Sequence, residues 1–141
     1  MNLKPNFLFL LLTLLQYVAA SPRETEALGY RWKYIVFTCK SASSYYTFGT
    51  NLTAYYTSLC GYEPITGTVV NCMANELGPD SNLFQKSLKR LANTCTLYGG
   101  HNYTADQLES LYKNATENLI DLNTVTTNLT TTVFYQPVNV T

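Results

Sequence analysis

Four cysteines and a single histidine are the residues of this chain whose chemistry depends most on their spacing. The cysteines are Cys39, Cys60, Cys72 and Cys95, and the histidine is His101. A structural zinc site takes its ligands from closely spaced pairs such as C-x2-C. No two cysteines here are that closely spaced, and a single histidine supplies at most one further zinc ligand. The spacing therefore favours two disulfides.

The pairing of the cysteines is open among three connectivities. Cys60 and Cys72 flank one short loop and helix turn, whereas Cys95 lies on the inward face of a helix predicted downstream. We therefore favour Cys39 with Cys95 and Cys60 with Cys72. Two such bonds stabilise a small domain by restricting its unfolded chain.

No pattern of catalytic residues stands out in the chain. The motifs H-E-x-x-H, G-x-S-x-G and G-x-G-x-x-G are absent, as is a glycine-rich phosphate loop. One histidine excludes a haem held by a histidine pair within this chain. Scattered carboxylates could gather around a hard cation, but solvated surface is the favoured interpretation of these residues: Glu24, Glu26, Glu63 and Glu76. We expect no catalytic residue, no metal site and no bound cofactor.

Paired tyrosines are the chain's other distinctive feature. Tyr45-Tyr46 and Tyr55-Tyr56 could line a groove for a sugar or another small ligand. An aromatic core with a glycan-shielded surface also accounts for them, and we favour that interpretation.

The amino terminus indicates the compartment. Residues 1–20 contain Lys4, an apolar run over 7–15 and small residues before Ala20, which is the layout of a secretory signal peptide cleaved between Ala20 and Ser21. A retained signal anchor is the alternative. The run is too short for a membrane span, which needs about 20 apolar residues, and we predict no span in the mature chain.

Five N-x-S/T triplets mark the chain as an exported glycoprotein. The acceptor residues are Asn51, Asn102, Asn114, Asn128 and Asn139. Asn102 lies in a polar turn and Asn114 on the solvent side of a helix, so we expect at least these two to carry sugars. Once residues 1–20 and Lys4 with them are removed, nine acidic residues face eight basic ones, so neither nucleic acid nor an anionic membrane is indicated as a partner.

Apolar spacing predicts three helices. The first runs from about Thr66 to Leu77 and stops at Gly78-Pro79. The second spans about 81–98, with inward residues Phe84, Leu88, Leu91, Cys95 and Tyr98. The third starts at Thr104, whose pairing with Gln107 is a capping box. A short loop between the last two helices predicts an antiparallel pair.

The predicted fold is mainly α, a small disulfide-stapled helical domain. Residues 34–37 are apolar, but the run is too short to separate strand from helix, and 45–60 is compatible with two helical turns around a loop. The domain spans 21–122. Residues 123–141 are rich in Thr and Asn, which predicts an extended linker or tail without a core.

The order of cysteines and helix motifs over residues 34–120 resembles the extracellular amino-terminal region of fungal ferric/cupric reductases. The most specific motifs are Y-T-x-x-Q-L and L-Y-x-N-A-T on one helix. The segments that carry the resemblance are Cys39, Cys60-Gly-Tyr-Glu-Pro, Gly67-Thr-Val-Val-Asn-Cys72, Leu91-Ala-Asn-Thr-Cys95, Tyr103-Thr-Ala-Asp-Gln-Leu and Leu111-Tyr-Lys-Asn-Ala-Thr116. Many members have further cysteines between the positions of Cys39 and Cys60, where this chain has none.

The resemblance implies a role at the outer face of the cell. In that family the ectodomain precedes a membrane domain with haem and a cytosolic domain that binds FAD and NADPH, and this sequence contains neither. We therefore expect an accessory ectodomain of iron or copper reduction and uptake, as a truncated or split chain, with a membrane reductase as partner. The alternative is a free secreted glycoprotein that binds a cell-wall component. Both place the chain in the secretory pathway and outside the cell.

Overall fold

The computed structural model describes residues 22–140, with side chains from residue 32 onward. The predicted signal peptide and its cleavage site between Ala20 and Ser21 lie outside the described residues. Contacts divide the chain into two units, residues 1–31 and 32–141. The first unit contributes only a helical stretch from residue 22 to the description, and all sites below belong to the second.

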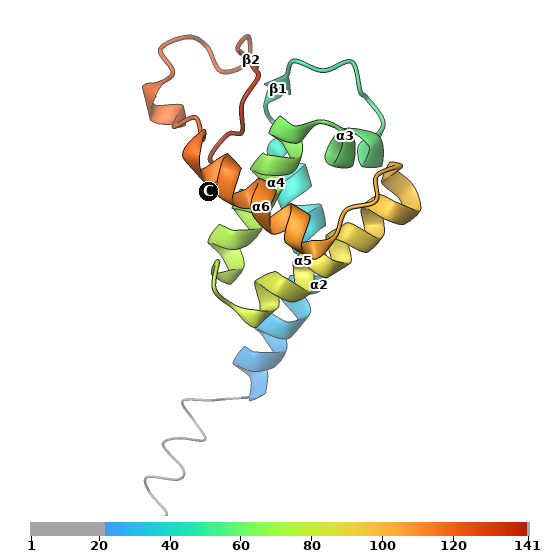
Figure 1. The fold of residues 1–141 in the computed structure, drawn as a ribbon. Helices are drawn as coiled ribbons and strands as arrows, with labels where there is room; N and C mark the ends of the chain where they lie inside the picture. Colours follow the sequence, from blue (N-terminus) through green and yellow to red (C-terminus); the bar gives the residue numbers. More distant parts are fainter. Residues whose placement is uncertain (1–21, 141) are drawn as a thin grey trace, which may run out of the picture. The chain divides into compact units, whose positions relative to one another are not determined.

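The protein is mainly helical, as predicted (Figure 1). In chain order the elements are α2 (Pro22–Ser43), β1 (Thr47–Phe48), α3 (Tyr55–Gly61), α4 (Glu63–Leu77), α5 (Asn82–Thr94), the π-helical turn η1 (Cys95–Gly99), α6 (Ala105–Glu117), the 3-10 turn η2 (Leu122–Thr124) and β2 (Val133–Phe134). The apolar run over 34–37 is helical, because Ile35 and Cys39 bury one face of α2 at helical spacing.

Helix α4 forms the centre of the core. Every residue from 65 to 74 is buried, and α4 contacts α3, α5 and α6. Pro64 lies in its first turn, where a missing N–H costs nothing. Its end at Leu77 is as predicted: Gly78 adopts φ 90°, a conformation that favours glycine, and donates its N–H to Ala74 O at 2.8 Å.

Helix α5 begins as the spacing predicts but ends earlier. The Ser81 hydroxyl accepts from Phe84 N at 3.0 Å and caps the helix. Leu88 and Leu91 are fully buried. From Cys95 the chain forms the wider π turn of η1, which rotates the following side chains away from the α-helical stripe. The prediction that Tyr98 points inward is therefore wrong, since its side chain is 64% exposed.

Helix α6 confirms the predicted capping box. Gln107 N donates to Thr104 Oγ1 at 3.1 Å, and Thr104 N donates to Gln107 Oε1 at 2.9 Å. Leu108 and Ala115 are buried, whereas Asn114 is exposed. Helices α5 and α6 contact each other, and α6 lies across α4 in Figure 1.

Two disulfides form, but the favoured pairing is wrong. Cys39 bonds Cys72 and Cys60 bonds Cys95, with Cα atoms 5.7 and 5.6 Å apart. The physical reason is that α4 begins at Glu63, so nine residues of helix carry Cys72 about 14 Å from the start of α4. A disulfide requires Cα atoms within about 7 Å. Cys60 lies in α3, just before the start of α4, and bonds Cys95 at the π turn instead.

The C-terminal segment is also different from the prediction. It was expected to be a linker without a core, yet Phe134, Val138 and Val140 are buried in a second apolar cluster. β2 pairs in parallel with β1, Thr47 opposite Val133 (Figure 1). The Thr-rich composition conceals this packing, because the buried residues of the segment are few and all follow Thr132.

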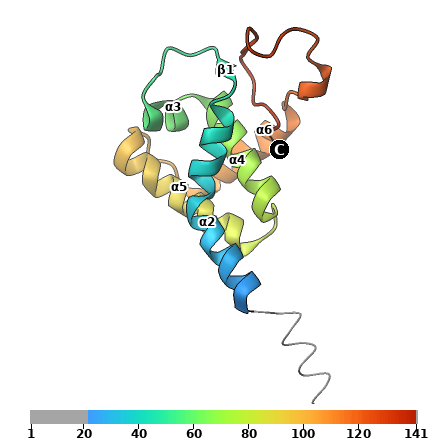
Figure 2. The same cartoon turned by 180° about the vertical axis from the view of Figure 1, so that it is seen from behind.

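The cyan C-terminal part of α2 lies in front of α4 and α5 in the view of Figure 2. Among the contacts of α2 with these helices are the Cys39–Cys72 bond and the Arg90 guanidinium, 5.8 Å from the centre of the Trp32 ring. Within residues 22–140, none of the helices has the length and hydrophobicity needed to cross a bilayer.

Candidate functional site

Four aromatic rings are exposed and follow one another on the outside of the helical unit. They belong to Phe37 on α2, Tyr55 and Tyr56 on α3, and Tyr98 on η1, and their side chains are 38–64% exposed. Ring centres are 6.5 Å apart for Phe37 and Tyr55, 4.9 Å for Tyr55 and Tyr56, and 5.2 Å for Tyr56 and Tyr98. We call this row the aromatic surface. Contiguous exposed apolar area of this kind marks contact sites more often than isolated exposed side chains do.

Lys40 borders the aromatic surface. The Lys40 ammonium lies 5.4 Å from the centre of the Tyr55 ring, within range of a cation–π interaction. Burial lowers the pKa of Lys40 and raises that of Tyr55, the latter with a smaller contribution from Tyr56. The local environment therefore disfavours charge on both groups, as expected for a partly dehydrated contact surface.

The Lys40 side chain also lines a cavity of about 190 Å³ beside the aromatic surface. Most of the other lining side chains carry hydroxyl groups: Ser43, Ser44, Tyr46, Thr50, Thr53 and Ser58. The Ser58 hydroxyl donates to Tyr55 O at 3.0 Å, which ties the cavity wall to the aromatic surface. Hydroxyl groups can both donate and accept, so this cavity suits a ligand that carries hydroxyl groups of its own.

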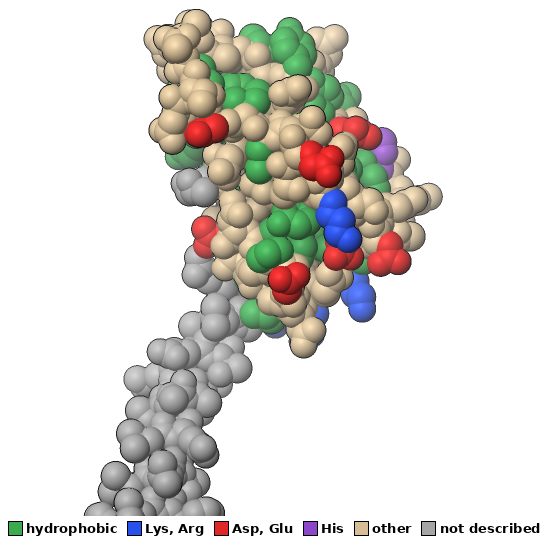
Figure 3. Space-filling model, turned by 60° about the vertical axis from the view of Figure 1, so that its left-hand side comes forward, with side chains coloured by type: hydrophobic (Ala, Val, Ile, Leu, Met, Phe, Trp, Pro, Cys, Tyr) green, Lys and Arg blue, Asp and Glu red, His purple; other side chains and the backbone are tan. Residues whose placement is uncertain are grey.

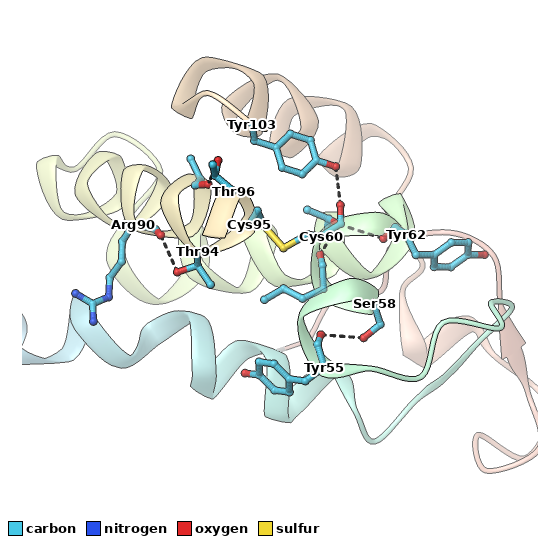
Figure 4. Close-up of a disulfide and its surroundings, with 12 residues drawn as sticks. Tyr55, Ser58, Cys60, Tyr62, Arg90, Thr94, Cys95, Thr96 and Tyr103 are labelled. Atoms are coloured by element: carbon cyan, nitrogen blue, oxygen red, sulfur yellow. Dashed lines mark hydrogen bonds between the residues drawn. A yellow bond between two sulfur atoms is a disulfide. The ribbon is translucent and has the colours of Figure 1, made fainter. Parts of the chain in front are cut away.

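The Cys60–Cys95 disulfide (Figure 4) links the elements that carry three of the four rings. It joins the end of α3, which carries Tyr55 and Tyr56, to η1, which carries Tyr98. Both cysteines are fully buried. The bond therefore fixes the separation between the two halves of the aromatic surface.

Gly99 allows η1 to approach the disulfide closely. A Cβ atom at this position would lie 2.5 Å from Cys60 Sγ and 2.7 Å from Cys60 Cβ, closer than real Cβ atoms come to other heavy atoms. A side chain here would push η1, and Tyr98 with it, away from α3.

Tyr103 supports the same region from the other side. Its hydroxyl donates to Cys60 O at 2.8 Å (Figure 4), and burial, followed by the negative charge of Glu63, raises its pKa. Tyr103 directly precedes the capping box of Thr104 and Gln107. The Y-T-x-x-Q-L motif thus consists of residues that connect α6 to the disulfide and start the helix.

The structure separates the paired tyrosines considered above. Tyr55 and Tyr56 lie on the aromatic surface. Tyr46 packs edge-on against Phe134, with ring centres 6.0 Å apart, and Tyr45 is 85% exposed. Tyr46 therefore belongs to an aromatic cluster of the core, as the favoured interpretation has it, and the interpretation of Tyr55 and Tyr56 as ligand contacts stays a prediction. Sequence reasoning missed Phe37, because the secondary structure of its segment was undecided.

The five acceptor asparagines, Asn51, Asn102, Asn114, Asn128 and Asn139, are all exposed. His101 is also exposed, and its ring stacks on Tyr103 with centres 5.8 Å apart. Glu63 and Glu76 lie near opposite ends of α4. Across the described part of the chain, no group of three acidic, histidine or cysteine residues is placed to hold a metal ion. On the face drawn in Figure 3, charged side chains are dispersed among uncharged ones.

Comparisons with protein families, with curated protein sequences and with solved structures find no match to this chain. The resemblance to ferric/cupric reductase ectodomains consequently depends on the motifs alone.

Proposed function

We propose that this chain is a secreted glycoprotein domain that binds a neutral polysaccharide of the cell wall through the aromatic surface. The observation that carries the proposal is the row of exposed rings that the Cys60–Cys95 bond holds in place. A pyranose ring has C–H groups on its faces and hydroxyl groups on its edge. Its faces stack on aromatic rings, and its hydroxyl groups bond to polar side chains.

The surroundings of the aromatic surface favour an uncharged ligand. The hydroxyl-lined cavity beside it contains no acidic side chain and a single cation, Lys40, whose charged form is disfavoured by burial. Successive rings along α2, α3 and η1 offer several stacking positions in a row, which suits a polymer better than a single sugar.

The test measures sedimentation of the purified glycoprotein with insoluble β-glucan and with chitin. We expect Tyr56→Ala and Tyr98→Ala each to weaken binding by about tenfold, which corresponds to about 1.4 kcal/mol. Tyr45→Ala is the matched control, since Tyr45 is more exposed than either and should not change binding. Equal binding of all three variants, or none by the parent protein, would reject the aromatic surface as the site.

A second candidate is an accessory role in ferric or cupric reduction by a membrane reductase. It is supported by the Y-T-x-x-Q-L motif, whose residues Tyr103, Thr104 and Gln107 build the junction of α6 and Cys60, as expected for residues that specify a shared fold. Deleting the gene and measuring ferric-chelate reduction at the cell surface separates the candidates. An accessory ectodomain predicts reduced activity that the restored chain rescues, whereas a wall-binding domain predicts no change.

A further inference from the structure

A second cavity lies where three segments of the chain meet. It measures about 180 Å³ and is lined by the start of α4, one side of α6 and the segment that follows β2. The lining residues used below are Pro64, Asn114, Asn118, Tyr135, Gln136 and Pro137. We call it the Asn114 cavity. Sites for drug-sized ligands measure about 300–1,000 Å³, so this one has room for a group of about one sugar ring.

Asn114 combines a wall position in this cavity with a glycosylation acceptor sequence. The triplet is Asn114-Ala-Thr116, and its asparagine is exposed. Asn118 Nδ2 donates to Asn114 O at 2.9 Å and to Asn114 Oδ1 at 3.3 Å. Asn118 therefore bonds the two oxygen atoms of Asn114 and does not engage Asn114 Nδ2, the atom to which a sugar is attached.

The chemistry of the cavity wall matches an N-acetylglucosamine ring. The Tyr135 ring, 69% exposed, and Pro64 and Pro137 offer apolar surfaces for the C–H faces of the sugar. Gln136 and Asn118 offer amide groups for its hydroxyl and acetamido groups. Without a sugar, the Tyr135 ring lies against Gly49 on one side and is otherwise exposed to water.

We propose that the first sugar on Asn114 occupies this cavity and fastens the C-terminal segment to α6. In the attachment step, Asn114 Nδ2 loses a proton and forms a bond to C1 of the sugar. The bond from C1 to the diphosphate of a lipid-linked oligosaccharide breaks, and the diphosphate leaves with the electron pair and, in the net reaction, takes up the proton. This inference rests on the extracellular placement in the proposed function, but not on polysaccharide binding.

The C-terminal segment is the part of the fold that gains from such a contact. Its described polar connections to the helices are few: Val138 N to Thr68 Oγ1 at 2.9 Å, and Asn139 Oδ1 accepting from Asn71 and Asn75 at 3.3 and 3.2 Å. Gly67 lies directly beneath Pro137, since a Cβ there would be 2.9 Å from Pro137 Cγ. A sugar between α6 and residues 135–137 would cover the opening of the Asn114 cavity.

The experiment uses a protein in which Asn114 is the one remaining acceptor. Asn51→Gln, Asn102→Gln, Thr130→Ala and Thr141→Ala remove the other triplets. These choices keep Thr104, which caps α6, and Asn139, which bonds Asn71 and Asn75. Intact mass then reports whether Asn114 carries a glycan.

Three forms of this protein are compared by amide hydrogen exchange over residues 133–140. The first has the whole glycan, the second is trimmed by an endoglycosidase to one N-acetylglucosamine, and the third carries Thr116→Ala and has no sugar. We expect the first two to exchange equally and the third about tenfold faster in this segment, with no change in α5. Tyr135→Ala in the trimmed form should give the fast exchange, whereas Tyr45→Ala should not.

The outcomes separate this inference from the proposed function. A bare Asn114, or equal exchange in the trimmed and sugar-free forms, would overturn the seating of the sugar. Polysaccharide sedimentation, measured on the same samples, reports on the aromatic surface independently, so either result can fail while the other holds.

Discussion

The hydrogen bond between Thr68 and Val138 is the sharpest test of how the C-terminal segment docks. Thr68 is fully buried on α4, and its hydroxyl donates to Pro64 O at 2.7 Å while accepting from Val138 N at 2.9 Å. Thr68→Val keeps the shape of the side chain and removes both bonds. Val138, also fully buried, would then hold an N–H without this acceptor.

The loss of stability expected for Thr68→Val follows from the unpaired N–H of Val138. Leaving a buried donor without an acceptor costs about 1–3 kcal/mol, a large share of the 5–15 kcal/mol that stabilises a typical domain. Thr38→Val on α2 is the matched control. Its hydroxyl makes the same type of bond one turn back, to Tyr34 O at 3.1 Å, but is exposed, so water replaces the bond and the cost stays within about 0.5 kcal/mol.

Urea unfolding with the disulfides intact measures both changes. For a slope of about 2 kcal/mol/M, a loss of 2 kcal/mol moves the midpoint by about 1 M. Amide exchange at Val138 should accelerate in Thr68→Val and not in Thr38→Val. Equal midpoints for the two variants would refute the docking of the segment through this bond.

Three further predictions concern the Cys60–Cys95 bond and the aromatic surface that it holds. Gly99→Ala places a Cβ 2.5 Å from Cys60 Sγ and should lower stability by about 1–3 kcal/mol through overpacking. Gly61→Ala is the control and should cost less, because its nearest contact is the movable His101 side chain at 3.0 Å. Thermal unfolding compares the two variants, and equal melting temperatures would contradict the close approach of Gly99 to Cys60. Tyr103→Phe removes the bond to Cys60 O and should cost about 1 kcal/mol. Because the folded state raises the pKa of Tyr103, the stability linked to its protonated form is present below the ordinary tyrosine pKa and is lost as the pH rises through the folded value. Ultraviolet titration of the variant should lack one component that ionises above the ordinary tyrosine pKa. The Lys40 ammonium should titrate at lower pH in the native protein than in urea, because burial lowers its pKa. NMR titration of the Lys40 side chain in both states measures the difference, and equal pKa values would contradict the burial of this group.

Local signals in the sequence predicted the end of α4 and the starts of α5 and α6, whereas α2 was left undecided. The start of α6 depends on two residues three positions apart, Thr104 and Gln107, and the end of α4 depends on Gly78, so each follows from a few neighbouring side chains. The exposure of Asn114 follows from the same helical spacing.

Features that depend on distant residues could not be predicted in this way. The disulfide pairing is decided by where α4 begins, at Glu63, and not by the loop length between Cys60 and Cys72. Tyr98 leaves the helical stripe because η1 must bring Gly99 against Cys60. The packing of Phe134 requires β1 as its neighbour, which lies more than eighty residues earlier in the chain.

The aromatic surface was only partly within reach of sequence reasoning. Tyr55 and Tyr56 are adjacent in the chain and were considered as ligand contacts. Phe37 and Tyr98 join them through two different helical elements, and the two halves are held together by a disulfide whose pairing the sequence left open.

The interleaved order of the two disulfides has a consequence for a chain exposed to proteases. Cys39 bonds Cys72 and Cys60 bonds Cys95, so the two covalent rings overlap between residues 60 and 72. If the backbone is cut once between Cys39 and Cys60 and once between Cys72 and Cys95, all three pieces stay joined. With nested bonds the same two cuts would release the middle piece as a separate peptide. The domain can therefore be cleaved at both flanks of the overlap and still remain one covalent molecule.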